Sequence, residues 1–245
     1  WRLVRDRLAD TFDAYLTFET PELAPSPNTA STAKEPPLPE RLREMRATWT
    51  ATNWVLQAQI ARIEVKLRRT AGNADPREAE RAEIESYLFG LKYDPHHVLI
   101  NRRVNEVSAR CARDRRIEDM ATLNENVLTI NPANTTAARD LALAHLLLGR
   151  FDRVERVVTA AIGTRTDAAF ESRLLAVAQY LLGNADAARA SLERARTSTG
   201  AGFVLADAVG AELAGDRARA LELVTAAERS PDLAELARRV RETLK

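Results

Sequence analysis

Three histidines and one cysteine are the side chains of this 245-residue sequence best suited to bind a metal ion or act as a nucleophile. His96 and His97 are adjacent, so their rings would point in different directions on a helix, and no cysteine or third histidine lies near them in sequence. Cys111 and His145 fall at packing positions of helical segments, where a thiol usually serves as a small buried apolar group. Nucleophilic catalysis would also need a nearby base and a group that orients it. We therefore expect no metal site, no cofactor and no catalytic thiol.

Two pairs of carboxylates, Glu78/Glu80 and Glu83/Glu85, lie within one charged helical segment. A general acid–base pair needs burial and a cleft that separates the two pKa values, and nothing in this pattern implies either. We expect these side chains to form a solvated helix face. The sequence also lacks the glycine-rich nucleotide-binding motifs, the nucleophile-elbow motif and the zinc-protease motif. These observations predict that the protein is not an enzyme.

The segment NRRVNEVSARCARDRR, residues 101–116, contains six arginines and two acidic residues, which gives a local charge of +4. It could be a solvated helix face, a contact for an acidic protein or lipid surface, or a contact for nucleic acid. The segment has no aromatic side chain on which bases could stack. The whole chain has 36 basic and 35 acidic residues, so it is not a polycation of the kind that binds nucleic acid. Nucleic acid is therefore the least favoured partner.

The composition favours helices, because 45% of the residues are hydrophobic, only 5% are aromatic and there are nine glycines. The longest strongly apolar stretch is LALAHLLL at residues 141–148. It is well short of the roughly 20 residues that a membrane-spanning helix needs. We therefore expect no transmembrane span in this chain. A single cysteine excludes an internal disulfide framework and fits either the cytoplasm or a periplasm-like compartment.

The N-terminal part divides into a helix and a linker. Residues 1–18 place apolar side chains at helical spacing and are predicted to form an amphipathic helix; its contact residues are Trp1, Val4, Leu8, Phe12 and Leu16. This helix could dock on the rest of the chain or on a partner, and the acids on its polar face argue against a membrane-surface helix. Residues 19–41 hold six of the ten prolines and are predicted to be an extended linker. Because the first residue is Trp1 rather than methionine, we expect that a preceding segment, such as a signal or anchor, is missing.

Three glycines in the second half of the chain, Gly149, Gly183 and Gly215, are spaced by 34 and 32 residues. Four other columns keep the same register relative to these glycines: Ala142/Ala176/Ala208, Val154/Ala188/Ala220, Val158/Leu192/Val224 and Ala161/Ala195/Ala227. Small residues let two antiparallel helices approach closely, and glycine allows the left-handed backbone that ends the first helix. Each unit is therefore predicted to be a helix–turn–helix of about 34 residues that must stack on its neighbours to bury its apolar faces.

This pattern resembles the tetratricopeptide repeat (TPR) family in repeat length, small-residue columns, turn glycine and terminal proline. The resemblance implies an all-α, right-handed helical-repeat solenoid of antiparallel helix pairs. It covers residues 101–245 well and the divergent helical pair at 42–100 poorly. We place repeats at 101–134, 135–168, 169–200 and 201–232, followed by a C-terminal capping helix. The sequence departs from the family where Arg115 replaces the first turn glycine, and where His145, Gln179 and Ala211 stand at the usual tyrosine positions.

In this family the first helix of each unit lines a concave face that commonly binds peptides or extended segments. Asn105, Arg139 and Arg173 would occupy one column of that face, 34 residues apart. Neighbouring guanidinium groups favour an anion between them, such as an acidic segment or a terminal carboxylate. The alternative is that these arginines only solubilise the helix surface. The predicted partner-binding residues are Arg102, Asn105, Arg113, Arg139, Arg173, Val177 and Tyr180.

The sequence thus predicts a non-catalytic scaffold or assembly subunit that binds a protein partner through the concave face and the N-terminal arm. One alternative is a periplasmic or membrane-peripheral subunit of a larger membrane complex, anchored by a segment before Trp1. Another is a regulatory sensor domain of a longer protein. The compartment, cytoplasmic or periplasmic, is left open, as are a peripheral membrane association and a homo-oligomer.

Overall fold

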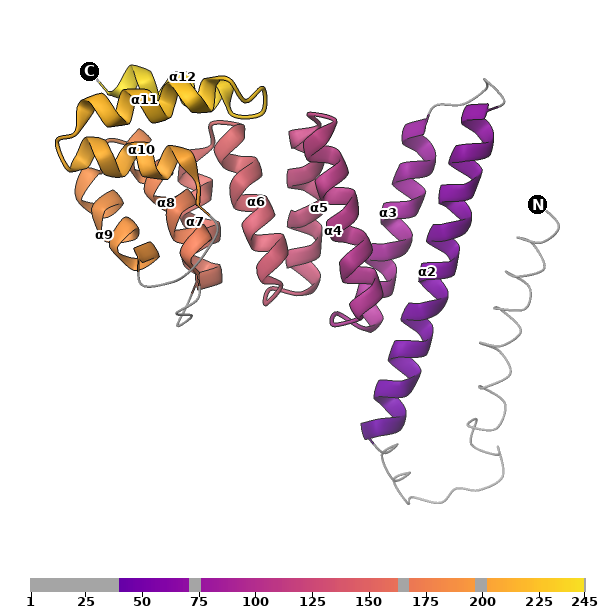
Figure 1. The fold of residues 1–245 in the computed structure, drawn as a ribbon. Coiled ribbons are helices and arrows are strands. Elements are labelled where there is room, and N and C mark those ends of the chain that lie inside the picture. The colour runs from indigo at the N-terminus through magenta and orange to yellow at the C-terminus, as the bar shows by residue number, and fades with distance from the viewer. Residues whose placement is uncertain (1–39, 71–75, 163–167, 197–201, 245) are drawn as a thin grey trace, which may run out of the picture.

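The computed structural model describes residues 40–70, 76–162, 168–196 and 202–244, and within these ranges all regular structure is α-helix (Figure 1). The protein is therefore all-α, as predicted. The helices are α2 (Glu40–Thr70), α3 (Pro76–Tyr93), α4 (Val98–Arg113), α5 (Ile117–Ile130), α6 (Thr135–Leu147), α7 (Phe151–Ile162), α8 (Ala169–Leu181), α9 (Ala185–Arg196), α10 (Val204–Leu213), α11 (Arg217–Glu228) and α12 (Ala234–Thr243). The predicted N-terminal helix and residues 19–39 of the predicted linker lie outside the described residues. Glu40 and Arg41, which the linker prediction included, belong to α2.

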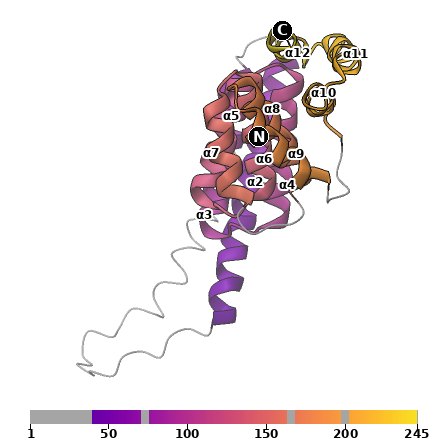
Figure 2. The same cartoon turned by 90° about the vertical axis from the view of Figure 1, so that its left-hand side faces the viewer.

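Successive helices pack on one another and form a row that begins with α2 and α3 (Figure 1). The helices α4, α6, α8 and α10 also contact one another in that order, and α2 contacts α4, so these helices form one layer of the row. The predicted repeats 135–168, 169–200 and 201–232 each contain one consecutive pair of helices, whereas α4 begins at Val98, three residues before the predicted start of the repeat at 101–134. Figure 2 looks along the row and shows that α10 and α11 lie to one side of it.

The turns between paired helices share one geometry, and the three glycines of the sequence repeat are at its centre. Gly149, Gly183 and Gly215 have φ angles of 73°, 80° and 85°, which an L side chain rarely adopts. After α6, the Gly149 N–H donates to the Leu146 carbonyl at 3.1 Å, and the next N–H, of Arg150, donates to the His145 carbonyl at 2.8 Å. This pair of hydrogen bonds is the Schellman motif, which satisfies carbonyls at a helix C-terminus. The same pair recurs at Gly183 and at Gly215.

Arg115 occupies the equivalent place in the turn between α4 and α5. Its φ angle is 57°, and it is the one non-glycine residue with positive φ in the described part of the chain. Its N–H donates to the Ala112 carbonyl at 3.0 Å, and the Arg116 N–H donates to the Cys111 carbonyl at 2.8 Å. The turn geometry is therefore kept where the glycine is absent, at the cost of a strained backbone.

The core is built from the small-residue columns that the sequence repeats. Ala142, Ala176 and Ala208 are fully buried on the first helices of three successive pairs, and Ala188 and Ala220 are fully buried on second helices. The core forms two clusters, one around α2–α6 and one around α6–α12, and both contact Leu143 and Val157. The apolar interior is thus continuous along the row.

The closest approach of α2, α3 and α4 is at Gly90. A Cβ atom added at Gly90 would lie 2.5 Å from Cδ1 of Ile100 on α4, 3.2 Å from Cβ of Trp54 and 3.3 Å from the carbonyl oxygen of Ala51, both on α2. Only glycine lets the three helices come this close. Gly90 therefore fixes the position of α4 relative to the first two helices.

The C-terminal helix α12 packs on α6, α8, α10 and α11. Its apolar face, with Leu236, Val240 and the following Leu244, is buried. Arg241 makes a bidentate ion pair with Glu228 at 2.7 and 2.8 Å, which ties α12 to the end of α11. None of the helices in the described ranges is long and apolar enough to cross a lipid bilayer.

Candidate partner-binding surface

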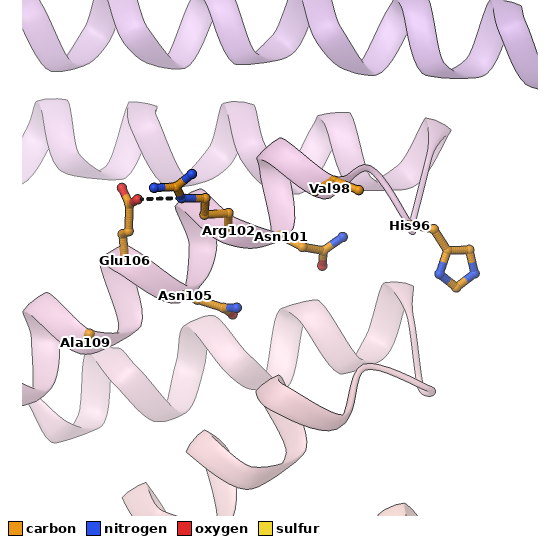
Figure 3. A pocket seen from close by; sticks show the side chains of 7 residues that line it. All are labelled: His96, Val98, Asn101, Arg102, Asn105, Glu106 and Ala109. Atoms are coloured by element: carbon orange, nitrogen blue, oxygen red, sulfur yellow. Dashed lines mark ion pairs between the residues drawn. The ribbon is translucent and has the colours of Figure 1, made fainter.

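A shallow, open groove runs along the exposed side of α4 (Figure 3). The residues that line it are His96, Val98, Asn101, Arg102, Asn105, Glu106 and Ala109. Arg102 and Asn105 were predicted as partner-binding residues. Figure 3 shows that the side chains of Asn101 and Asn105, one helical turn apart, extend from the same side of α4. The Asn101 amide nitrogen donates to the carbonyls of Pro95 and His97, both at 3.0 Å, so Asn105 is the amide that can donate to and accept from an extended backbone laid along the helix.

The groove is positioned by the N-terminus of α4, which His97 caps. The Nδ1 atom of His97 accepts from the Ile100 N–H at 3.3 Å, and its Nε2 lies 3.0 Å from the hydroxyl oxygen of Thr52 on α2. Since Nδ1 accepts, the neutral ring carries its proton on Nε2 and donates to Thr52. Both ring nitrogens are therefore used for structure, as expected for a histidine that is not a metal ligand. No group of three or more histidine, cysteine, aspartate or glutamate side chains in the described ranges could hold a metal ion.

Buried polar contacts set the register between α4 and α6. The Ser108 hydroxyl on α4 donates to Asp140 on α6 at 2.9 Å, and Asn124 on α5 donates to the Ser108 oxygen at 3.0 Å. Nearer the start of both helices, Asn134 donates to the Asn101 carbonyl oxygen at 2.8 Å. Burial raises the pKa of Asp140, although the hydrogen bond from Ser108 opposes this shift. Asn105 lies on α4 between these two contacts, so it faces the same side of the row as the first half of α6.

Arg139 precedes Asp140 on α6, the helix that contacts both α4 and α8. Its side chain is 44% exposed, and its guanidinium carbon lies 6.0 Å from the ring centroid of Phe170 on α8. The Phe170 ring in turn makes an edge-to-face contact with Phe203, with the centroids 6.0 Å apart. A cation over an aromatic face is held in place without losing its charge. The Nε atom of Arg139 also lies 3.9 Å from Oδ1 of Asp140, so Arg139 is a partly exposed cation held between Asp140 and Phe170 on the helix next to α4.

Two of the predicted partner-binding residues do not lie on the surface, so their prediction was wrong. Val177 is fully buried and Tyr180 is 8% exposed, because α8 is packed against α6, α7, α9, α10 and α12. Helix α12 packs against α8 in the layer of α4, α6, α8 and α10, which the sequence predicted to be open to a partner. The side of the layer available to a partner is therefore centred on α4 and α6.

The other predicted residues differ in their surroundings. The Arg102 side chain is 76% exposed and makes an ion pair with Glu106 at 3.4 Å, so the groove carries less positive charge than the sequence suggests. Arg113 is exposed at the last residue of α4, away from the groove lining. Arg173 is half-buried on α8. The N-terminal contact residues Trp1, Val4, Leu8, Phe12 and Leu16 lie outside the described residues.

Two arginines of the arginine-rich segment form ion pairs with α3. Arg110 binds Glu80 at 2.9 Å and Glu83 at 3.1 Å, and Arg116 binds Glu80 through two nitrogens at 2.6 and 2.9 Å. These contacts join α3 to α4 and to the start of α5. The expectation of a solvated face is wrong for Glu80 and Glu83, because their partners lie 27 to 36 residues further along the chain. Burial by itself would raise the pKa of Glu80, but the hydrogen bonds and charges of the two arginines outweigh it and lower that pKa.

The remaining nucleophilic and titratable candidates are buried within the helix pairs. Cys111 is fully buried, and burial raises the pKa of its thiol, which keeps it protonated and unreactive. His145 is 2% exposed, and burial lowers its pKa, opposed by Glu125 at 3.6 Å from Nε2. Neither side chain lines the groove. Their surroundings support packing roles.

Sequence reasoning missed five lining residues of the groove: His96, Val98, Asn101, Glu106 and Ala109. The spacing of Asn101, Asn105 and Ala109, four residues each, was a usable signal, because such residues share one helix face. Glu106 was not predicted because the neighbouring arginines dominate the net charge of residues 101–116.

Comparisons with protein-family models, with curated proteins and with solved structures found no significant match to this chain.

Proposed function

We propose that this protein is a non-catalytic, TPR-like helical-repeat scaffold that binds a protein partner along the groove of α4 and the adjoining part of α6. The observation that carries the proposal is the combination of Asn105 in the groove of α4 with the partly exposed Arg139 on α6, the helix that contacts α4. The repeat assignment is supported by the Schellman turns at Arg115, Gly149, Gly183 and Gly215, spaced by 34, 34 and 32 residues. It is also supported by the side-by-side packing of α4, α6, α8 and α10.

The chemistry of the groove favours an extended segment that carries a carboxylate. Amide side chains can satisfy the N–H and C=O groups of a bound backbone, which would otherwise lose hydrogen bonds to water. Arg139 can then make a charge-assisted bond to a carboxylate of the segment. Arg102 lies 3.4 Å from Glu106, which also pairs with Arg103 at 2.6 Å, whereas the contact of Arg139 with Asp140 is longer, at 3.9 Å. We therefore assign Arg139 as the cation for the ligand.

The proposal is tested by partner capture with matched arginine variants. A tagged chain with Arg139→Glu should lose at least tenfold of its bound partner relative to wild type, because an attraction is replaced by a repulsion. The control is Arg156→Glu on α7, where Arg156 is exposed and pairs with Asp152 four residues earlier. Equal loss in both variants, or equal retention in both, would contradict a partner site at α4 and α6.

A further inference from the structure

Helix α2 has two apolar faces. Ala51, Val55 and Ala58 are buried in the core beside α3 and α4. On the other side of the helix, Trp49, Leu56, Ile63 and Leu67 have exposed fractions of 59%, 49%, 37% and 47%. With about 100° of rotation per residue, these four side chains lie roughly 150° around the helix axis from the buried face.

The middle of α2 also lacks charge. Residues 47–61 contain no charged side chain, although 29% of the residues in the whole chain are charged. A helix at the end of a row normally turns a charged face to water. An uncharged helix with apolar residues on two sides is instead typical of a helix that is packed between other helices.

The spacing of the second face indicates that a helix covers it. Trp49, Asn53, Leu56, Ile60, Ile63 and Leu67 follow one another at intervals of four, three, four, three and four residues; we call them the outer stripe. This alternation is the heptad pattern of helices that pack side by side, and a single asparagine within it commonly fixes register. From Trp49 to Leu67 the stripe is about 27 Å long at 1.5 Å per residue.

We propose that residues 1–18 of the same chain form a helix that packs antiparallel on the outer stripe. Trp1, Leu8, Phe12 and Tyr15 are spaced by seven, four and three residues. With Ile63 and Trp49 left out, the outer stripe read backwards has the same spacing from Leu67 through Ile60 and Leu56 to Asn53. The resulting pairs are Trp1–Leu67, Leu8–Ile60, Phe12–Leu56 and Tyr15–Asn53. The last pair matches the one amide in the stripe with the phenol that can hydrogen-bond to it.

The linker favours this orientation and this occupant. Residue 18 and Glu40 are separated in sequence by 21 residues, and a flexible chain of that length has a typical end-to-end distance of about 25 Å. In the antiparallel register residue 18 lies beside residue 50, about 15 Å along α2 from Glu40, whereas a parallel helix would end about 40 Å away. A tether of this length also gives an effective concentration in the millimolar range, against which a second copy or a partner must compete.

The consequence reaches beyond the proposed scaffold function. The apolar stripe of the N-terminal arm would be occupied within the chain and would complete the first end of the row. A partner would then meet the groove of α4 and α6 while the arm stays docked. Loss of the groove contact and loss of arm docking are separate outcomes, because they involve different faces of the molecule.

Disulfide trapping in the full 245-residue chain tests the register directly. The variant carries Phe12→Cys and Leu56→Cys with Cys111→Ala, which removes the native thiol. We expect mild oxidation to convert most of the protein to an internally cross-linked monomer, identified by a joined peptide in mass spectrometry. The matched control is Phe12→Cys with Glu85→Cys, because Glu85 is exposed on α3; it should cross-link at least tenfold more slowly.

Three outcomes would overturn the proposal: dimers joined through two copies of Cys at position 56, two thiols that alkylate freely without cross-linking, or equal rates in both variants. Hydrogen exchange on the unmodified chain provides a second measurement that needs no substitution. Peptides within residues 1–18 should exchange at least tenfold more slowly than peptides within residues 20–39. Equal exchange in the two regions would also overturn it.

Discussion

At the scale of single residues, the protein keeps a turn geometry where its preferred residue is missing. Arg115 adopts φ 57° because the Schellman hydrogen bonds on either side of it require a left-handed residue. A non-glycine residue in this conformation costs about 1–2 kcal/mol, and a glycine costs about 0.5–1 kcal/mol of unfolded-chain entropy. The backbone strain of Arg115 is therefore larger than the entropic cost that a glycine at this position would add.

Arg115→Gly is expected to stabilise the protein by about 0.5–1 kcal/mol, measured by urea unfolding. The control is Arg113→Gly, two residues earlier and also exposed, where helical φ makes glycine unfavourable by about 0.5–1 kcal/mol. Destabilisation by both substitutions would contradict the assignment of strain to Arg115.

Because of the ion pairs of Glu80, the folded protein becomes less stable as the pH falls. The folded pKa of Glu80 lies below its ordinary value of 4.5, so the folded state binds fewer protons there than the unfolded state. The stabilisation is therefore complete above about pH 4.5 and is lost as the pH falls through the folded pKa.

Glu80→Gln should cost about 1–3 kcal/mol of unfolding free energy at pH 7, because it weakens hydrogen bonds to Arg110 and Arg116. The difference from wild type should shrink between pH 5 and pH 3, as followed by denaturant unfolding at each pH. Glu85→Gln on the exposed part of the same helix should change stability by less than about 0.5 kcal/mol. A Glu80→Gln effect that persists unchanged at pH 3 would contradict this account.

At the scale of elements, the approach of α2, α3 and α4 depends on Gly90. Gly90→Ala would gain about 1 kcal/mol of helix propensity but would place a methyl group against Ile100 and against the backbone of Ala51. The steric cost of about 1–3 kcal/mol exceeds this gain, so we expect a net loss of up to about 2 kcal/mol in thermal or denaturant unfolding.

Ile100→Val distinguishes this contact from a general effect, because it removes the Cδ1 atom that the new methyl group would meet. The double variant Gly90→Ala/Ile100→Val should be more stable than the sum of the two single effects predicts. Strict additivity would show that the three helices do not meet at Gly90 as described.

The elements also show what the sequence could and could not predict. The columns containing Ala142, Ala188 and Val224 identified buried positions correctly, because local spacing on a helix determines which face is apolar. The burial of Val177 and Tyr180 could not be read in this way, since it depends on the packing of α8 against several helices, including α6, α10 and α12, that are distant from it in sequence. The ion pairs of Glu80 and Glu83 were missed for the same reason: residue types give the charge but not the distant partner.

At the scale of the whole molecule, burial and charge leave one side of the row suited to a partner. The end formed by α8, α10 and α12 is packed, and two of the six arginines in residues 101–116 form ion pairs with α3. The groove of α4 and the cation of Arg139 remain accessible on adjacent helices. The proposed scaffold function follows from this combination, together with the buried positions of Cys111 and His145.

The most direct test of this account is site-specific photo-cross-linking with a benzophenone amino acid placed at Ala109 in the groove, and at Ala160 on α7 as the control. Both alanines are exposed, so neither substitution disturbs the core. The account predicts that one partner is cross-linked from position 109, is not cross-linked from position 160, and is lost when Arg139→Glu is added. Cross-linking of the same partner from both positions, or from position 160 alone, would contradict a binding surface centred on α4 and α6.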